Sequence, residues 1–176
     1  MDVHDLGIRS DAIDVALLVF VLFHTPDPSR SLTEVLQVLR GGGAVGIVTW
    51  GKDPGLPGLA IWNEELDRQG AGPDQRDRSV MQQGLMDTTE KLSALLNRAG
   101  YERLRIWELM LRHEWKVEDL LAAQIGCGMA ARRLASLSAT RRAKCTSRVQ
   151  ARLKVLTHSE LTYRPEVLFA VAHRPV

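Results

Sequence analysis

The distribution of apolar residues predicts two strands joined by a helix near the start of the chain. Residues 15–22 (VALLVFVL) and 44–50 (AVGIVTW) form almost uninterrupted apolar runs, which are typical of strands buried on both faces of a parallel sheet. Between them, apolar residues recur at helical spacing over residues 28–40, and Asp27 and Pro28 suit a helix start. Strand, helix and strand within about forty residues predict a right-handed crossover with parallel strands.

Glycines separate the next elements. Gly41–Gly43 are expected to end the first helix, because glycine readily adopts the left-handed conformation found at helix C-termini. Residues 51–86 are rich in glycine and proline around one short helical segment, 59–68. A connection of this length within a domain is typical of a lid or a binding loop.

The second half of the chain alternates helices and strands. Residues 87–90 (DTTE) have the pattern of a capping box that begins a helix. The pattern then predicts a strand with a bulge at 103–115 and a last strand at 166–173. Further helices are predicted at residues 117–125 and 129–156. Together these elements predict an α/β layered domain.

The composition narrows the class of protein. The chain has 176 residues, 45% of them hydrophobic and 25% charged, which is typical of one globular domain. No apolar run reaches the roughly 18 residues that span a bilayer, and the N-terminus lacks a signal-peptide pattern. Two cysteines, Cys127 and Cys145, fit a reducing compartment better than a disulfide framework. We therefore expect a cytoplasmic protein without a membrane partner.

Charge is distributed unevenly along the chain. Residues 1–88 contain 7 Lys and Arg against 13 Asp and Glu, and residues 89–176 contain 16 against 8. Eight basic residues lie within 132–154, where no acidic residue occurs. Such a block could attract nucleic acid, but it lacks the interleaved aromatic residues of a single-strand platform. A solvated helix face is the simpler interpretation, so we expect no nucleic-acid partner. The residues expected to be exposed on that face are Arg141, Lys144, Arg148 and Arg152.

Short motifs in the first 43 residues follow an order that resembles one known family. They are Asp2, Ile13-Asp14-Val15, Val21-Leu22-Phe23-His24, Pro26-Asp27-Pro28, Glu34, Val38-Leu39-Arg40 and Gly42-Gly43. Together they resemble the middle of class I S-adenosylmethionine-dependent methyltransferases that act on small molecules. The later elements follow the family's order too, so the resemblance covers nearly the whole chain. It implies the C-terminal half of a Rossmann-like methyltransferase sheet, mostly parallel with an antiparallel last strand, plus a helical lid.

The chain departs from the family pattern in three respects. Gly41 stands where the family has proline, and Phe23 stands where it has its first histidine. The family's glycine-rich loop and first three strands would lie upstream of this sequence. The resemblance thus implies one methyltransferase-like domain over residues 1–176, incomplete at its N-terminus, with lid or substrate-side insertions at 51–86 and 116–160. It also implies that the last strand lies between the strands at 44–50 and 103–115.

The resemblance assigns residues to the cofactor, which would be S-adenosylmethionine. Asp2 would accept a hydrogen bond from the adenine amino group, and Val3 would offer a backbone contact. Leu18 and Phe23, at the end of the first strand, would face the methionine portion. The simpler interpretation of Asp2 is a solvated carboxylate at a frayed terminus.

The chemistry of methyl transfer suggests further candidates. Transfer from a sulfonium requires alignment and exclusion of water, with a base only where the acceptor must lose a proton. His24 is the candidate base or acceptor contact, although a turn histidine bonded to local backbone would look the same. Trp50 and Trp62 could line an apolar acceptor pocket or belong to the core. The histidines and cysteines show no metal-ligand spacing, so no metal is expected.

Three interpretations of the function stay open. The first is methyl transfer to a small, apolar acceptor molecule by an enzyme of which this chain is the C-terminal portion. The second is a non-catalytic methyltransferase-like remnant that binds proteins through an exposed sheet edge. The third is nucleic-acid binding by the basic helix. We expect the chain as given to bind cofactor negligibly and to self-associate through the strand at 14–20.

Overall fold

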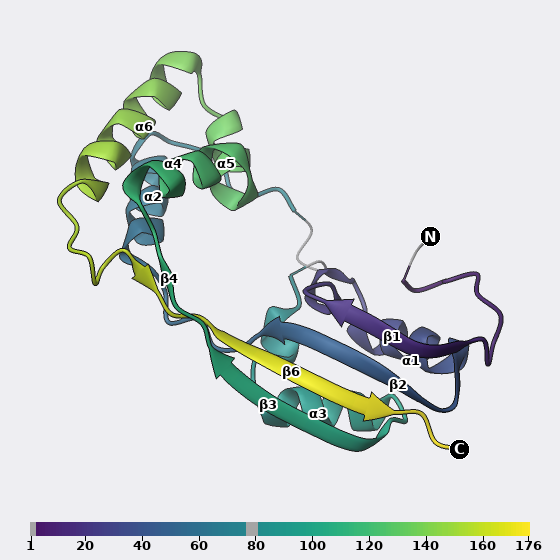
Figure 1. The fold of residues 1–176 in the computed structure, drawn as a ribbon. Coiled ribbons are helices and arrows are strands. Elements are labelled where there is room, and N and C mark those ends of the chain that lie inside the picture. The colour runs from purple at the N-terminus through teal and green to yellow at the C-terminus, as the bar shows by residue number, and fades with distance from the viewer. Residues whose placement is uncertain (1–2, 77–80) are drawn as a thin grey trace. The chain divides into compact units, whose positions relative to one another are not determined.

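The structure, a computed structural model, describes residues 3–76 and 81–176. The chain forms two compact units, each with its own hydrophobic core. The sheet unit comprises Met1–Asp53, Asp77–Met110 and Pro165–Val176, and the helical unit comprises Pro54–Arg76 and Leu111–Arg164. Each unit is described by itself below (Figure 1).

Four strands build the sheet unit, in the order β1-β2-β6-β3. They are β1 (Ile13–Val19), β2 (Leu39–Trp50), β3 (Glu102–Met110) and β6 (Glu166–His173). β1 and β2 are parallel neighbours, and β6 runs antiparallel to both β2 and β3. The predicted parallel pair and the insertion of the last strand between 44–50 and 103–115 are therefore confirmed. The predicted bulge in the third strand is also present, between Glu102 and Arg105.

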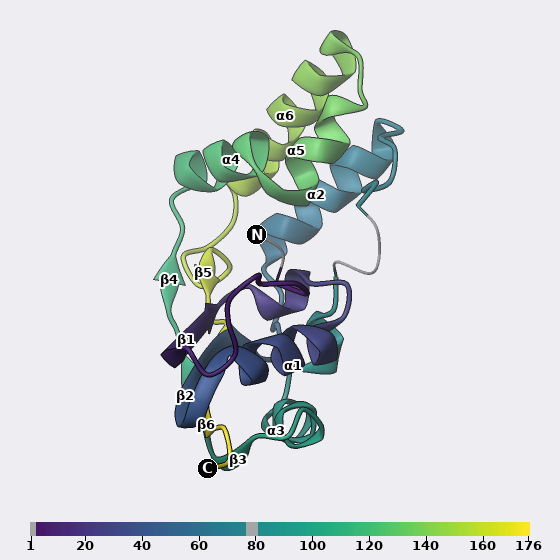
Figure 2. The ribbon, with the colours of Figure 1, turned by 90° about the vertical axis from the view of Figure 1, so that its right-hand side faces the viewer.

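Two helices cover one face of this sheet, α1 (Pro28–Val38) and α3 (Thr89–Arg98), as Figure 2 shows. Their apolar stripes pack on the sheet in one cluster that includes Leu32, Leu96, Ile47 and Leu168. The buried Tyr101 hydroxyl donates to the Leu32 carbonyl oxygen at 3.0 Å. On β1, the side chains that alternate with this buried face are exposed.

Both predicted helix boundaries in this unit are shifted. The first helix ends at Val38, and Gly41–Gly43 lie within β2 instead of ending the helix. A Cβ at Gly43 would lie 2.8 Å from the Arg40 carbonyl oxygen, so close backbone packing explains that glycine. The capping box is displaced by one residue, because Thr88 caps α3 by accepting from the Lys91 amide.

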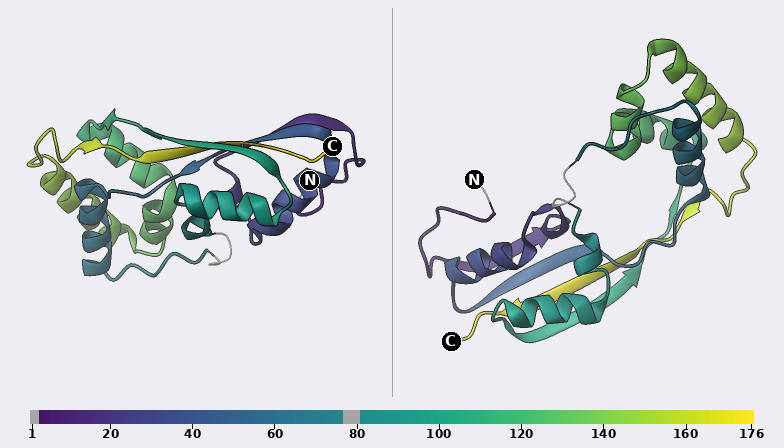
Figure 3. Two further views of the ribbon diagram at one scale, coloured as in Figure 1. Left: turned by 90° about the horizontal axis from the view of Figure 1, so that it is seen from below. Right: turned by 180° about the vertical axis from the view of Figure 1, so that it is seen from behind.

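Helices make up most of the second unit. They are α2 (Pro57–Arg68), α4 (Val117–Gly126), α5 (Gly128–Ala135) and α6 (Ala139–Leu153). Two short strands, β4 (His113–Glu114) and β5 (Thr162–Tyr163), pair antiparallel (Figure 3). The core includes Trp62, Leu66, Cys145 and Val149. Nowhere in residues 3–76 and 81–176 is a helix both long enough and apolar enough to cross a bilayer.

The single long helix predicted at 129–156 is wrong, because the chain forms two helices there. α5 ends at Ala135, and Ser138 starts α6 by accepting a hydrogen bond from the Arg141 amide. A serine at this place satisfies a free amide of the new helix and so favours a restart over continuation.

Candidate functional site

The carboxyl end of β1 turns sharply at an aromatic residue. Phe20 has a φ of 52°, in the left-handed region that side chains other than glycine rarely adopt. Its amide still donates to the Val48 carbonyl oxygen at 2.8 Å, which ties the turn to β2. The short helix η1 (Leu22–His24) follows directly. Strained backbone of this kind is concentrated at binding and catalytic sites, so this turn is the first candidate.

An aromatic pair lies at this turn. The rings of Phe20 and Trp50 are 4.5 Å apart between centroids, with their planes inclined by 34°. Trp50 is the last residue of β2. Because β1 and β2 are parallel neighbours, both residues lie at the edge where the carboxyl ends of the strands meet. Ligands of open α/β sheets bind beyond this edge.

Two neighbouring glutamines bond to the backbone at this turn. The Gln83 side-chain amide donates to the Trp50 carbonyl oxygen, and the Gln82 backbone amide donates to the Phe23 carbonyl oxygen at 2.9 Å. Phe23 is buried, and its ring contacts that of His24, with centroids 4.3 Å apart. His24 itself is exposed. His24 thus lies directly beyond the turn, and nothing in the sequence pattern pointed to the left-handed Phe20.

The predicted cofactor residues lie in or against one apolar cluster. Leu18 and Phe23 are buried in the core of the sheet unit, and Val3 packs against the same core. Trp50 also packs on it. Asp2 lies outside the described residues. Val3, Leu18 and Phe23 thus share one hydrophobic core with Phe20 and Trp50.

Trp62 belongs to the helical unit. It is fully buried in that core, and its indole N–H has no hydrogen-bond partner among the described residues. An unsatisfied buried donor is unfavourable by about 1–3 kcal/mol. The structure therefore places the ring as a core residue of α2 with one unused donor.

A polar hollow of about 220 Å³ lies on the helix-covered side of the sheet unit. Its lining residues are Lys52, Thr88, Thr89, Glu90, Glu108, Glu166 and Leu168. Hydrogen bonds from its own backbone amide, Thr88 and Thr89 lower the pKa of Glu90. No group of three metal-ligating side chains occurs in the described part of the chain.

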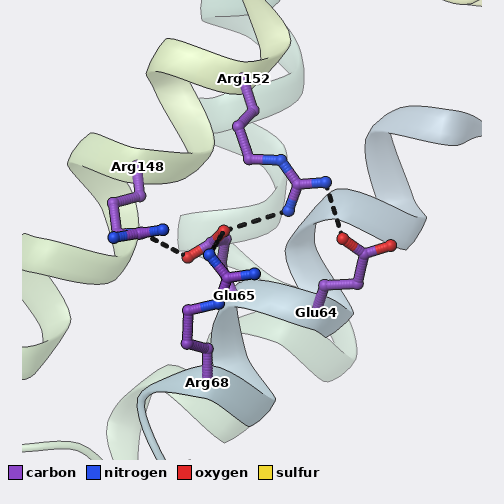
Figure 4. Close-up of polar contacts among 5 residues, drawn as sticks. All are labelled: Glu64, Glu65, Arg68, Arg148 and Arg152. Atoms are coloured by element: carbon purple, nitrogen blue, oxygen red, sulfur yellow. Dashed lines mark hydrogen bonds and ion pairs between the residues drawn. The ribbon is translucent and has the colours of Figure 1, made fainter.

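The basic helix α6 is held to α2 by a buried carboxylate (Figure 4). The side chain of Glu65 is fully buried and accepts from Arg148 Nε at 2.8 Å and Arg152 Nη1 at 3.0 Å. Arg68 contributes a third contact at 3.2 Å, and Arg152 also bonds Glu64 at 2.6 Å. Arg148 is exposed as predicted, but Arg152 is only partly exposed, and both guanidinium groups are paired.

Opposing effects set the pKa of Glu65. Burial alone would raise it, but hydrogen bonds from Arg148 and Arg152 and the charges of Arg148 and Arg68 outweigh burial and lower the pKa. Glu65 is therefore ionised at neutral pH, and its charge neutralises part of the basic block. Arg148 and Arg152, two of the four basic residues predicted to lie on a solvated face, instead hold α6 against α2.

Comparisons with known proteins agree with this architecture. Residues 1–47 match the family model described as a methyltransferase domain. A search of curated proteins finds no match. A protein from Bacillus halodurans described as a methyltransferase is 14% identical, with a TM-score of 0.54, over all of this chain and 76% of its own. The YcgJ protein from Bacillus subtilis is 14% identical, with a TM-score of 0.56, over all of this chain and 70% of its own.

The match to a third solved structure covers a smaller share of that protein. Phosphoethanolamine N-methyltransferase 2 from Haemonchus contortus, in complex with phosphomonomethylethanolamine and S-adenosylhomocysteine, is 13% identical with a TM-score of 0.50. The match covers 99% of this chain and 36% of that one. At such identities the comparisons establish the fold, and the resemblance to class I methyltransferases is confirmed at that level.

Proposed function

We propose that the turn after β1 and the end of β2 form part of a site for methyl transfer from S-adenosylmethionine to a small, apolar acceptor. The observation that carries this proposal is the left-handed Phe20 packed on Trp50 at the carboxyl ends of two parallel strands. That edge is where open α/β sheets bind ligands, and backbone strain is retained there for function. The family match, which ends within β2, supports the same region.

The residues at this edge fit the cofactor in part. Aromatic faces such as those of Phe20 and Trp50 attract cationic groups, and a sulfonium is one. Polar groups nearby are already engaged: the Thr25 hydroxyl donates to Leu22, and the Gln83 amide donates to Trp50. The described residues thus suit the methyl-bearing sulfur, but do not suit the ribose hydroxyls or the carboxylate.

S-adenosylmethionine, when bound, supplies a methyl group on a positively charged sulfur. In our proposal, Phe20 and Trp50 exclude water from that group, and Leu18, Phe23 and Val3 support them from the core beneath. Exclusion of water and alignment are the main requirements of this displacement. His24 is proposed as the base or acceptor contact, because it is exposed directly beyond the turn. Direct contact of Trp62 with an acceptor stays a prediction.

The partial fit leads to a second element of the proposal. We propose that groups outside residues 1–176 complete the polar part of the cofactor site. The chain by itself should then bind S-adenosylhomocysteine weakly, because each missing hydrogen bond is worth about 1 kcal/mol, and more where charge is involved. Loss of several such bonds changes a micromolar dissociation constant to about millimolar.

Titration calorimetry tests whether groups outside residues 1–176 are needed for cofactor binding. With the 176-residue chain, we expect no measurable heat at micromolar S-adenosylhomocysteine. A version extended upstream should bind with micromolar affinity, and Trp50→Ala should weaken that binding while Trp107→Ala, a matched change at an exposed tryptophan of β3, leaves it unchanged. Micromolar binding by residues 1–176 alone would show that the polar site is complete. Equal effects of the two substitutions would remove Trp50 from the site.

A further inference from the structure

The ladder of hydrogen bonds between β1 and β2 stops one step before the end of β2. Phe20 donates to the Val48 carbonyl oxygen at 2.8 Å, and backbone groups that point to the same side of a strand recur every second residue. The Trp50 carbonyl oxygen therefore points to the same side of β2, beyond the last bond from β1. In a continued parallel ladder residue 22 would donate to it, but Leu22 already belongs to η1.

The side chain of Gln83 takes the place of that strand residue. Its amide nitrogen donates to the Trp50 carbonyl oxygen, and its oxygen accepts from Thr49 Oγ1 at 3.5 Å. Thr49 is fully buried, so its hydroxyl needs a partner within the protein. One side chain thus satisfies a backbone acceptor and a buried donor at the last two residues of β2.

The short helix η3 (Gln83–Leu85) is itself held from two sides. Lys91 of α3 donates to the Gly84 carbonyl oxygen at 2.9 Å, and the backbone amide of Gln82 donates to the Phe23 carbonyl oxygen at 2.9 Å. η3 is therefore bonded to α3 and to the turn after β1. A side chain on such a support can fix the position of the groups that it contacts.

We propose that Gln83 is a positioning residue of the methyl-transfer site, an inference that rests on the function proposed above. By holding the Trp50 carbonyl, it keeps the Trp50 ring packed on Phe20 where the chain leaves the sheet in the left-handed conformation. Strained backbone persists only where its surroundings fix it. In this proposal Gln83 acts through Trp50 and does not itself contact the cofactor.

Replacing Gln83 with methionine tests the position of Trp50 in the absence of cofactor. Methionine is also unbranched, but it cannot donate to the Trp50 carbonyl. The indole signal of Trp50 in nuclear magnetic resonance spectra of the 176-residue chain should shift, because the ring moves relative to Phe20. The signal of Trp107 should stay in place, which shows that the variant is folded.

Two further variants separate the hydrogen bond from the shape of the side chain. Gln83→Glu keeps the shape and an acceptor for Thr49, but at neutral pH its carboxylate has no donor for the Trp50 carbonyl, so it should shift the Trp50 signal as methionine does. Gln82→Met is the matched control, because it removes only the side-chain bond to the Pro26 carbonyl oxygen at 3.3 Å. It should leave the Trp50 signal unchanged. Equal shifts with Gln82→Met and Gln83→Met, or none with either, would overturn the proposal.

Addition of S-adenosylhomocysteine up to about 5 mM tests the link to the site. Both Gln83 variants should raise the dissociation constant about three- to tenfold, as expected for the loss of one hydrogen bond, and Gln82→Met should change it less than about twofold. An unchanged dissociation constant in the Gln83 variants would refute the positioning role. No response of Trp50 in the parent chain would instead contradict the proposed function, and the spectra without cofactor would still decide whether Gln83 holds Trp50.

Discussion

Replacing Glu65 with glutamine should release α6 from α2 in the helical unit. The carboxylate is fully buried and contacts Arg148 at 2.8 Å, Arg152 at 3.0 Å and Arg68 at 3.2 Å. Glutamine has nearly the same shape, but it removes the charge and turns an amide donor toward guanidinium donors. The substitution therefore tests the ion pairs with little change in packing.

The magnitude follows from the surroundings of the pair. Removing one partner of a buried salt bridge is unfavourable by about 3–5 kcal/mol. The three arginines are each more than a third exposed, so water can partly replace the lost contacts. We therefore expect a loss of about 2–3 kcal/mol in the free energy of opening this unit. Glu64→Gln, at the half-exposed neighbour that contacts Arg152, should lose less than about 1 kcal/mol.

The buried thiol of Cys145 provides the assay. Cys145 is in the same core, and burial, together with the charge of Glu65, raises its pKa. A thiol reagent can reach it only when the helical unit opens, so the labelling rate reports the opening equilibrium. With the exposed Cys127 replaced by serine, Glu65→Gln should label about 30–150 times faster than the parent chain. Equal labelling rates of Glu65→Gln and Glu64→Gln would refute the argument.

The pH dependence of unfolding in urea gives a second check. The pKa of Glu65 is lower in the folded chain than in the unfolded chain. Its contribution to stability is therefore present above the unfolded value, about 4.3, and is lost as the pH falls below it toward the folded value. Glu65→Gln should remove this part of the acid sensitivity, and Glu64→Gln should retain it.

Three further predictions concern other parts of the molecule. Tyr101→Phe removes the buried hydrogen bond to Leu32 and should lower the free energy of unfolding in urea by about 1 kcal/mol, whereas no change would mean that water replaces it. Gly43→Ala should be more destabilising than Gly46→Ala, by about 1–3 kcal/mol, because a Cβ at residue 43 meets the backbone of Arg40, whereas a Cβ at residue 46 meets only the mobile end of the Leu17 side chain. The same urea titration ranks the two variants, and the reverse order would contradict the packing. Binding of α6 to duplex or single-stranded DNA should be weak and disappear near physiological salt in an anisotropy titration, because two of its arginines are paired with Glu65; sequence-specific binding that persists would revive the nucleic-acid interpretation.

Elements with local signals could be predicted from the sequence. The parallel β1–α1–β2 unit follows from two apolar runs and a helical stripe. Its predicted boundaries are wrong where Gly41–Gly43 continue as strand and where β1 ends at Val19 instead of residue 22. The predicted burial of this strand on both faces is also wrong, because Val15, Leu17 and Val19 are exposed. The place of β6 between β2 and β3 was available only from the family resemblance, because strand order depends on contacts between distant segments.

The two most informative residues of the structure were missed for different reasons. Glu65 lies on the apolar stripe of α2, three residues after Trp62, and that position could have signalled a buried carboxylate with distant partners. No local pattern predicts that Phe20 is left-handed, because glycine or asparagine would be expected at such a turn. Strain of this kind depends on the tertiary contacts that hold it, which here include Val48 and Trp50.

The most direct test of the proposed site uses the tryptophan indole signals in nuclear magnetic resonance spectra. The chain has four tryptophans, of which Trp50 lies at the site, Trp107 on β3, and Trp62 and Trp115 in the helical unit. S-adenosylhomocysteine is added up to about 5 mM, which populates even a site with a millimolar dissociation constant. We predict a saturable shift of the Trp50 indole signal, assigned by Trp50→Phe, while the Trp107 signal stays in place. A shift of Trp107 without Trp50, or no shift at all, would contradict a cofactor site at the carboxyl ends of β1 and β2.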